Sequence, residues 1–251
     1  MKRFLTLLGY EVARTLRRPL AYAVMACFLF LCGLNFQASL SGLLRVPSTV
    51  TLSEAFFNSL LFWFPFLLLI PIVTMRLFSE EYKLGTIETL MTAPVRDYQV
   101  VLAKFFGALI FYAVLWLPTL LLFGAFWVIS GQTPAETLPG LLGGYLLLMF
   151  AGAFYLSIGC LASALTDNQI VAAIITLSLV CATFFLGLLW FFFPSESPLL
   201  RQLSYYLSTL EHMSDFSRGI FDSRPLAFYA TNSAFVLFLT YHALQYRRWR
   251  A

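Results

Sequence analysis

The stretch FSEEYKLGTIETLMTAPVRDYQVVLAK, residues 78–104, is a run of charge and threonine between two long apolar segments. Those flanking segments decide the fold class. Of the 251 residues, 60% are hydrophobic and only 11% are charged, whereas an ordinary soluble domain has roughly 25% charged residues. The composition places the chain among membrane proteins, so the polar stretch needs a specific explanation.

Six stretches that lie between charged residues are long and apolar enough to span a bilayer, which takes about 20 residues. These stretches are 20–44, 55–75, 105–129, 138–165, 170–193 and 226–246. They predict an all-α integral membrane protein with six transmembrane helices in a single domain over residues 1–251. Every formal charge falls outside the six stretches, which disfavours a carrier driven by protons or ions, since such carriers usually need an ionisable residue within the bilayer.

Lysine and arginine are distributed unequally between the two faces of the predicted bundle. Twelve of them share a face with both termini and the polar stretch, and the other face has four, namely Arg45, Arg201, Arg218 and Arg224. Cytoplasmic loops carry the excess of basic residues. We therefore expect a multi-pass protein of the plasma (bacterial inner) membrane with both termini in the cytoplasm.

Residues 1–18 are predicted to form an amphipathic helix at the membrane interface, ended by Pro19. Lysines and arginines occupy one part of its helical wheel and would face the headgroups of membrane lipids. The alternative is a simple basic flank of the first span. The apolar sector consists of Phe4, Leu5, Leu8, Val12 and Leu16.

Motifs for enzymatic chemistry are absent from the sequence. There is no glycine-rich phosphate loop and no H-E-x-x-H or G-x-S-x-G motif. His212 and His242 are the only histidines, so few side chains are available for a catalytic triad or a histidine metal site. We expect no catalytic residue, no metal and no cofactor bound by this chain, and no nucleic-acid partner.

Uncharged polar residues gather near the outer ends of the first two predicted spans. Asn35 and Ser39 lie in the first, and Asn58 and Ser59 lie in the second. They could line a transport path, or they could simply sit at the membrane interface.

The polar segment over residues 76–97 is predicted to contain a cytoplasmic helix. Over residues 76–92, four apolar side chains gather on one side of the wheel, although Glu80 and Glu88 intrude on it. Mixed charges and aromatic residues are typical of a helix that contacts another protein. The four apolar residues are Leu77, Leu84, Ile87 and Met91.

The same segment resembles the E-E-x-x-x-G-T-[IL]-E-x-L-[ML]-x-x-P-V pattern of the type-2 permeases of ATP-binding-cassette (ABC) exporters. The matching residues are Glu80, Glu81, Gly85, Thr86, Glu88, Leu90, Pro94, Val95 and Lys104. In that family the segment is a coupling helix that fits into a groove of a separate cytoplasmic ATPase. The resemblance therefore implies that the contact residues are Glu80, Glu81, Gly85, Thr86 and Glu88.

The resemblance also implies an assembly around this chain. Two copies of the ATPase would bind ATP and Mg, and a second permease, either another copy or a sister subunit, would complete the transmembrane unit. The stretch STLEHMSDFSRGIFDSRPLAFY, residues 208–229, resembles the subgroup that includes gliding-motility and copper-enzyme-maturation permeases.

The outer loop over residues 194–224 is too long to be a simple turn. Leu199, Leu203, Tyr206 and Leu210 form a helical stripe in it. In the resembling family, short helices of this loop cover the exit of the transport path. The alternative is a docking site for a periplasmic partner, formed by Glu211, His212, Asp215, Arg218 and Asp222.

Two functions remain open from the sequence. The first is a permease subunit of an ATP-driven exporter, whose apolar walls suit a hydrophobic or amphipathic cargo. The second is a membrane anchor or scaffold that recruits a cytosolic ATPase or a periplasmic partner without transporting a substrate.

Overall fold

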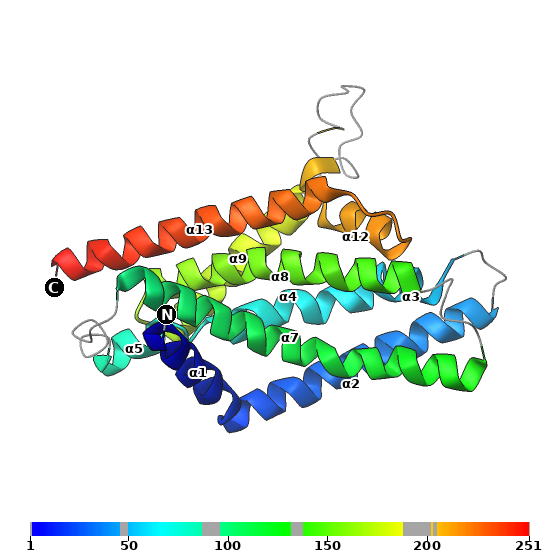
Figure 1. Cartoon of the computed structure of the whole chain (residues 1–251), viewed down its shortest axis with the longest axis horizontal. Helices are drawn as coiled ribbons and strands as arrows, with labels where there is room; N and C mark the ends of the chain where they lie inside the picture. Colours follow the sequence, from blue (N-terminus) through cyan, green and yellow to red (C-terminus); the bar gives the residue numbers. More distant parts are fainter. Residues whose placement is uncertain are drawn as a thin grey trace.

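The structure is a computed structural model, which describes residues 2–45, 50–86, 96–131, 138–187, 202 and 205–250. The described residues form helices and no strand, which confirms the all-helical prediction for these parts of the chain. Long helices run alongside one another, with α5 at one end of the bundle and α3 and α12 at the other (Figure 1). In chain order the helices are α1 (Lys2–Leu16), α2 (Pro19–Arg45), α3 (Leu52–Phe57), α4 (Leu60–Thr74), α5 (Ser79–Leu84), α7 (Asp97–Ser130), α8 (Leu138–Leu165), α9 (Gln169–Leu186), α12 (Thr209–Ser217) and α13 (Ser223–Arg250).

Among the described residues, five helical stretches are long and apolar enough to cross a membrane. They correspond to the first five of the six expected spans. α13 has 28 residues, but polar side chains such as Thr231, Asn232 and His242 lower its hydropathy, and it is not among the five. The five stretches are Pro19–Leu44, Leu60–Leu84, Asp97–Ser130, Leu138–Leu165 and Gln169–Leu186.

The second expected span, residues 55–75, is wrong at its start, because the helix is interrupted between α3 and α4. Ser59 caps α4 by accepting a hydrogen bond from the Leu61 N–H at 3.2 Å. Asn35 of α2 donates to the carbonyl of Phe56 at 3.1 Å, at the end of α3. The polar residues near the outer end thus satisfy backbone groups that the break exposes, a structural role that neither sequence alternative predicted.

The third expected span, residues 105–129, begins earlier than predicted. α7 starts at Asp97, so Lys104 lies within the helix and within the candidate span Asp97–Ser130 rather than before it. Its side chain is 1% exposed. The expectation that every charge lies outside the spans therefore fails: Asp97 and Lys104 lie in the stretch Asp97–Ser130, and Leu60–Leu84 includes Arg76 and the charges of α5. Lys104 is buried by protein.

α8 is the central helix of the bundle and contacts α4, α7, α9, α12 and α13. Its glycines permit close approach: a Cβ at Gly143 would lie 2.3 Å from the Phe216 carbonyl oxygen of α12, and one at Gly159 would lie 2.1 Å from Thr74 Oγ1 of α4. Small residues allow helices to approach in this way in membrane proteins. α8 consequently fixes the position of the helices at both ends of the bundle.

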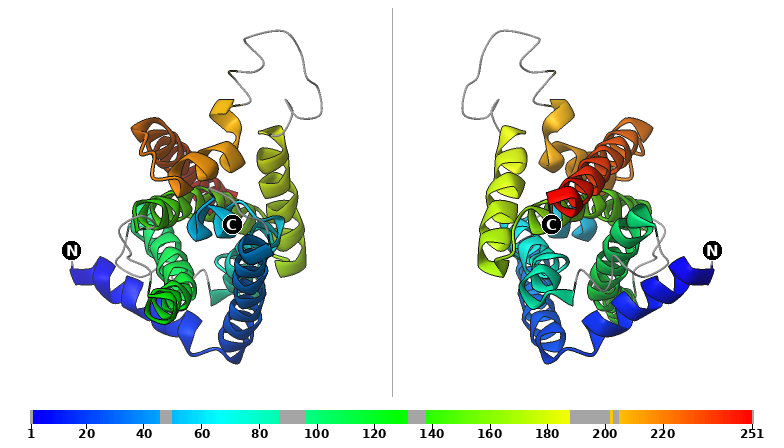
Figure 2. Two further views of the ribbon diagram at one scale, coloured as in Figure 1. Left: turned by 90° about the vertical axis from the view of Figure 1, so that its right-hand side faces the viewer. Right: turned by 90° about the vertical axis from the view of Figure 1, so that its left-hand side faces the viewer.

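Both termini lie in the half of the bundle that also holds α5 (Figure 1). Viewed along the long axis of the bundle, α1 runs crosswise and extends beyond the other helices (Figure 2). Its inner side packs against α7, where Glu11 Cβ would be 3.1 Å from a Cβ placed at Gly107. α1 thus packs crosswise on α7 in the half of the bundle that holds α5, and its position at a membrane interface stays a prediction.

Candidate functional site

α5 is a helix of six residues with a turn on either side. Gly85 ends it with a φ of +68°, and the Gly85 N–H donates to the carbonyl of Tyr82 at 3.1 Å. Only glycine adopts this left-handed conformation readily, and a Cβ at this position would meet no atom within 4 Å. The expected continuous helix over residues 76–92 is therefore wrong at Gly85, and residues 87–95 lie outside the described part of the chain.

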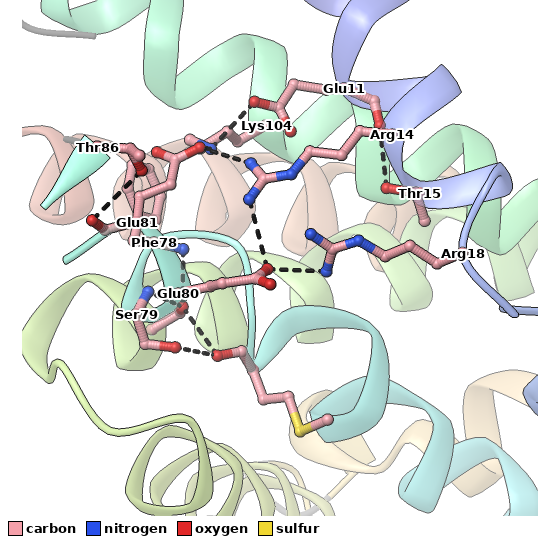
Figure 3. A network of polar contacts seen from close by, with 12 residues as sticks. Glu11, Arg14, Thr15, Arg18, Phe78, Ser79, Glu80, Glu81, Thr86 and Lys104 are labelled. Carbon is pink, nitrogen blue, oxygen red and sulfur yellow. Dashed lines mark hydrogen bonds and ion pairs between the residues drawn. The ribbon is translucent and has the colours of Figure 1, made fainter. Parts of the chain in front are cut away.

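The inner side of α5 joins a network of buried charges (Figure 3). Lys104 Nζ of α7 lies 2.6 Å from Glu81 Oε1 and 3.0 Å from Glu11 Oε1 of α1. Arg14 Nη1 lies 2.7 Å from the same oxygen of Glu81. Lys104 is 1% exposed, and the two carboxylates are each 7% exposed. The network thus joins three helices that are far apart in the sequence.

A second set of ion pairs extends this network toward the solvent. Arg18 Nη1 lies 2.7 Å from Glu80 Oε2, and Arg14 Nη2 lies 3.4 Å from the same atom. Burial alone would lower the pKa of Arg14, but the hydrogen bond to Glu81 and the nearby negative charges outweigh it and raise that pKa above its ordinary value. Arg14 therefore stays charged and bridges the two adjacent carboxylates of α5.

α8 and α13 hold the remaining sides of α5. The Ser163 hydroxyl accepts hydrogen bonds from the N–H groups of Phe78 at 3.0 Å and Ser79 at 3.2 Å, so a serine of α8 satisfies donors at the start of α5 that no residue of α5 itself caps. The Arg247 guanidinium of α13 lies 4.5 Å from the centre of the Tyr82 ring. α5 is therefore in contact with α1, α7, α8 and α13.

The predicted contact residues divide into two groups. Glu80 and Glu81 point into the protein and form ion pairs, whereas Gly85 and Thr86 are exposed. Glu88 lies outside the described residues. The partners of this segment, Glu11, Arg14, Arg18 and Ser163, were not predicted. Glu11 and Arg14 are nevertheless three residues apart on a helix otherwise rich in basic and apolar residues, a spacing that puts them on one face.

A comparison with protein families identifies the chain. A family model described as ABC-2 family transporter protein matches residues 7–183, which is more than two thirds of the 251 residues. The chain belongs to the ABC-2 transporter family. A comparison with curated proteins gives no match.

Membership of the ABC-2 family and the apolar helices together make the chain a multi-pass membrane protein and a membrane component of a transport system. The match begins within α1 and includes all of α5 and α7, and it covers every residue of the α1–α5–α7 ion-pair network. It ends before residues 208–229, on which the resemblance to the gliding-motility and copper-enzyme-maturation subgroup rests. That narrower resemblance stays a prediction.

At the opposite end of this ABC-2 protein, the predicted partner residues are mostly engaged within the chain. Asp215 accepts a hydrogen bond from the Tyr205 hydroxyl at 2.7 Å, and Arg218 Nε lies 2.7 Å from Glu54 Oε1 of α3. Asp222 accepts from the Arg224 N–H at 2.9 Å near the start of α13. Glu211 is exposed. Of the predicted stripe, Leu199 and Leu203 lie outside the described residues.

His212 corrects the expectation of an exposed chemical group in the outer loop. It is 2% exposed, and its Nδ1 lies 3.1 Å from the Tyr229 hydroxyl of α13. On the neighbouring turn, the Thr209 hydroxyl lies 2.8 Å from the Tyr155 hydroxyl of α8. These two contacts anchor α12 to the bundle. Within the described ranges, no three histidine, cysteine, aspartate or glutamate side chains are grouped as a metal site would require.

Acidification is expected to destabilise the anchored α12. Burial lowers the pKa of His212 below its ordinary 6.5, against the opposing charges of Asp215 and Asp222. The unfolded chain therefore binds the extra proton first as the pH falls. We expect the contribution of His212 to the free energy of unfolding to be constant above about pH 7.5. Below about pH 6.5 the free energy of unfolding should fall, by at most about 1.4 kcal/mol per pH unit for one proton.

Thermal unfolding of the detergent-solubilised protein at several pH values measures this effect. His212→Gln, which keeps a hydrogen-bonding side chain, is expected to reduce the loss of stability on acidification. The matched control is His242→Gln, which alters the only other histidine. An identical pH dependence in His212→Gln and the wild type would contradict the prediction.

Proposed function

We propose that this chain is the membrane-spanning permease subunit of an ATP-driven exporter and that the exposed end of α5 binds a separate cytoplasmic ATPase. The observation that carries the proposal is the position of α5, which is bonded to α1, α7 and α8 and contacts α13 through the Tyr82 ring. A force applied to such a segment reaches several long helices at once. Rigid-body and hinge movements of packed helices are the usual route for transmitting such a force.

The two groups of predicted contact residues support a division of roles. Lys83, Gly85 and Thr86 are exposed and adjacent, and we propose that they touch the ATPase together with Glu88. Glu80 and Glu81 pair with Arg14 of α1, and Glu81 also pairs with Lys104 of α7, so they would pass the movement of α5 to these helices. The sequence has no phosphate-binding loop, so ATP and Mg would be bound by two copies of the ATPase.

The proposed topology has six spans, with α13 as the sixth. A helix of 28 residues is about 42 Å long, enough to cross the apolar core of about 30 Å. An even number of spans agrees with the location of both termini in the half that holds α5. The distribution of basic residues favours the cytoplasmic side of a plasma (bacterial inner) membrane for this end.

The proposed function also assigns roles to α12 at the outer end of the bundle and to a second permease. α12 lies over the start of α8, with backbone contacts at Gly143, a position that suits a cover over the exit better than a free docking surface. A second permease, identical or related, would complete the transport path. Apolar helices suit a hydrophobic or amphipathic cargo.

A pull-down of the tagged chain in mild detergent, from cells of its own source, tests the proposal. Mass spectrometry of the eluate should identify a soluble ATPase subunit, and the eluate should hydrolyse ATP. Recovery of the chain without any ATPase under several mild conditions would contradict the permease proposal. An ATPase that is retained without ATP-dependent movement of a cargo into vesicles would favour the scaffold.

A further inference from the structure

A pocket beside the ion-pair network has basic and apolar walls. It has a volume of about 70 Å³ and lies between α1, α2 and α4, near Phe111 of α7. Its polar side is lined by three cations, two carboxylates and one hydroxyl: Arg14, Arg18, Arg76, Glu11, Glu80 and Thr15. Ala21 and Val24 of α2 and Val73 of α4 are among the residues that line its apolar side. The pocket therefore offers cations and an apolar surface within one small volume.

The charges around this pocket do not balance. The network and the pocket together contain four cations, Arg14, Arg18, Arg76 and Lys104, against the three carboxylates of Glu11, Glu80 and Glu81. Arg76 is the unmatched cation: its Nε is buried without a hydrogen-bond partner, and no carboxylate within the described residues pairs with it. A ligand with one negative charge would neutralise this excess.

We propose that the pocket binds the phosphate of an anionic phospholipid. Guanidinium groups match the geometry of phosphate oxygens, and Arg18 and Arg76 stand at the ends of two apolar stretches, where a lipid phosphodiester lies in a membrane. The volume fits a phosphate group but not a whole lipid. The acyl chains would lie along the apolar rim, where Leu20 and Ile72 are 40% and 39% exposed.

The placement of this pocket at the inner membrane surface rests on the proposed function. Because Arg18 also pairs with Glu80 of α5, the bound phosphate would share a cation with the segment that we propose for ATPase coupling. Lipid binding can nevertheless be measured on the permease alone. A missing ATPase in the pull-down would leave the binding result intact, and a failure to bind lipid would leave the ATPase contact intact.

Native mass spectrometry of the full chain in detergent tests the proposal with three probes: dioleoyl-phosphatidylglycerol, dioleoyl-phosphatidylcholine and glycerol 3-phosphate. We expect one phosphatidylglycerol per protomer, bound on the order of tenfold more tightly than phosphatidylcholine, because only the former is a net anion. Glycerol 3-phosphate, which lacks acyl chains, should not be retained. Equal retention of glycerol 3-phosphate and phosphatidylglycerol would overturn the lipid assignment and indicate a site for a soluble phosphate.

Two substitutions separate the pocket from general attraction to an anionic surface. Arg76→Gln should weaken phosphatidylglycerol binding on the order of tenfold, whereas Arg76→Lys should keep part of it. The matched control is Arg17→Gln, because Arg17 is an exposed arginine next to Arg18 that does not line the pocket. Equal weakening by Arg17→Gln and Arg76→Gln would overturn the proposal, and so would unchanged binding in Arg76→Gln.

A third substitution tests the apolar wall and leaves every charge in place. Val24→Phe should fill the pocket and also weaken phosphatidylglycerol binding, while its gel-filtration profile matches that of the wild type. Unchanged binding in Val24→Phe would overturn the placement of the lipid in this pocket.

Discussion

Lys104→Met is expected to lower the free energy of unfolding by about 3–5 kcal/mol, the range found when one member of a buried ion pair is removed. Lys104 is 1% exposed and pairs with both Glu11 and Glu81. After the substitution Glu81 keeps Arg14 as a partner, but Glu11 keeps no ion pair within the described residues. The cost therefore comes mainly from one buried carboxylate without a counter-charge.

Reversible denaturation in detergent, followed by tryptophan fluorescence, measures the loss. The matched control is Lys83→Met, which removes the exposed lysine of α5 and should change stability by less than about 0.5 kcal/mol. The double variant Glu11→Gln/Lys104→Met should recover part of the loss, because it removes the stranded charge. If Lys104→Met and Lys83→Met unfold at the same denaturant concentration, the buried network has no stabilising role.

Gly85→Trp is expected to leave the protein in the membrane but to lower the amount of ATPase that copurifies with it at least about tenfold. A tenfold drop is equivalent to about 1.4 kcal/mol of binding energy. A Cβ at Gly85 would meet no atom within 4 Å, so the indole would start from the exposed end of α5 without a clash at its Cβ. The left-handed backbone adds a strain of about 1–2 kcal/mol, which a folded bundle can absorb.

The bundle contains a matched control for this strain. Gly131 ends α7 with a φ of +65° and also has no atom within 4 Å of a Cβ, but it lies at the opposite end of the helix from Lys104. Gly131→Trp therefore introduces the same side chain and the same backbone strain away from the proposed contact. Equal ATPase recovery from the wild type and Gly85→Trp would contradict the contact at α5, and equal losses in Gly85→Trp and Gly131→Trp would attribute the effect to strain.

The first five spans were predictable because the length of an apolar stretch can be read directly from the sequence. The break before α4 was not, because Asn58 and Ser59 are polar residues that occur equally well at an interface and at a helix cap. The hydrogen bond from Asn35 to the Phe56 carbonyl shows that polar residues near the break satisfy backbone groups. α13 was predicted from its apolar residues, yet its polar residues leave it below the hydropathy of the other spans.

α5 lies within the segment 76–97 in which a helix was expected, but the direction of its side chains was not predictable. Glu80 and Glu81 are adjacent in a polar sequence, where mixed charges and aromatic residues made an external protein partner the natural interpretation. Their actual partners, Arg14, Arg18 and Lys104, come from helices before and after the second span. Charge pairs between distant residues leave no periodic pattern in a single sequence.

The sequence by itself determined the membrane class, the all-helical fold, the first five spans and the position of the polar segment, because these depend on local hydrophobicity and spacing. Only the tertiary structure decided that Glu80 and Glu81 face inward, that Lys104 is buried within α7 and that Ser163 holds the start of α5. Each of these facts depends on helices distant in the sequence meeting at one end of the bundle. Burial of charge is stable only where a partner of opposite sign is brought within reach, and folding alone supplies that partner.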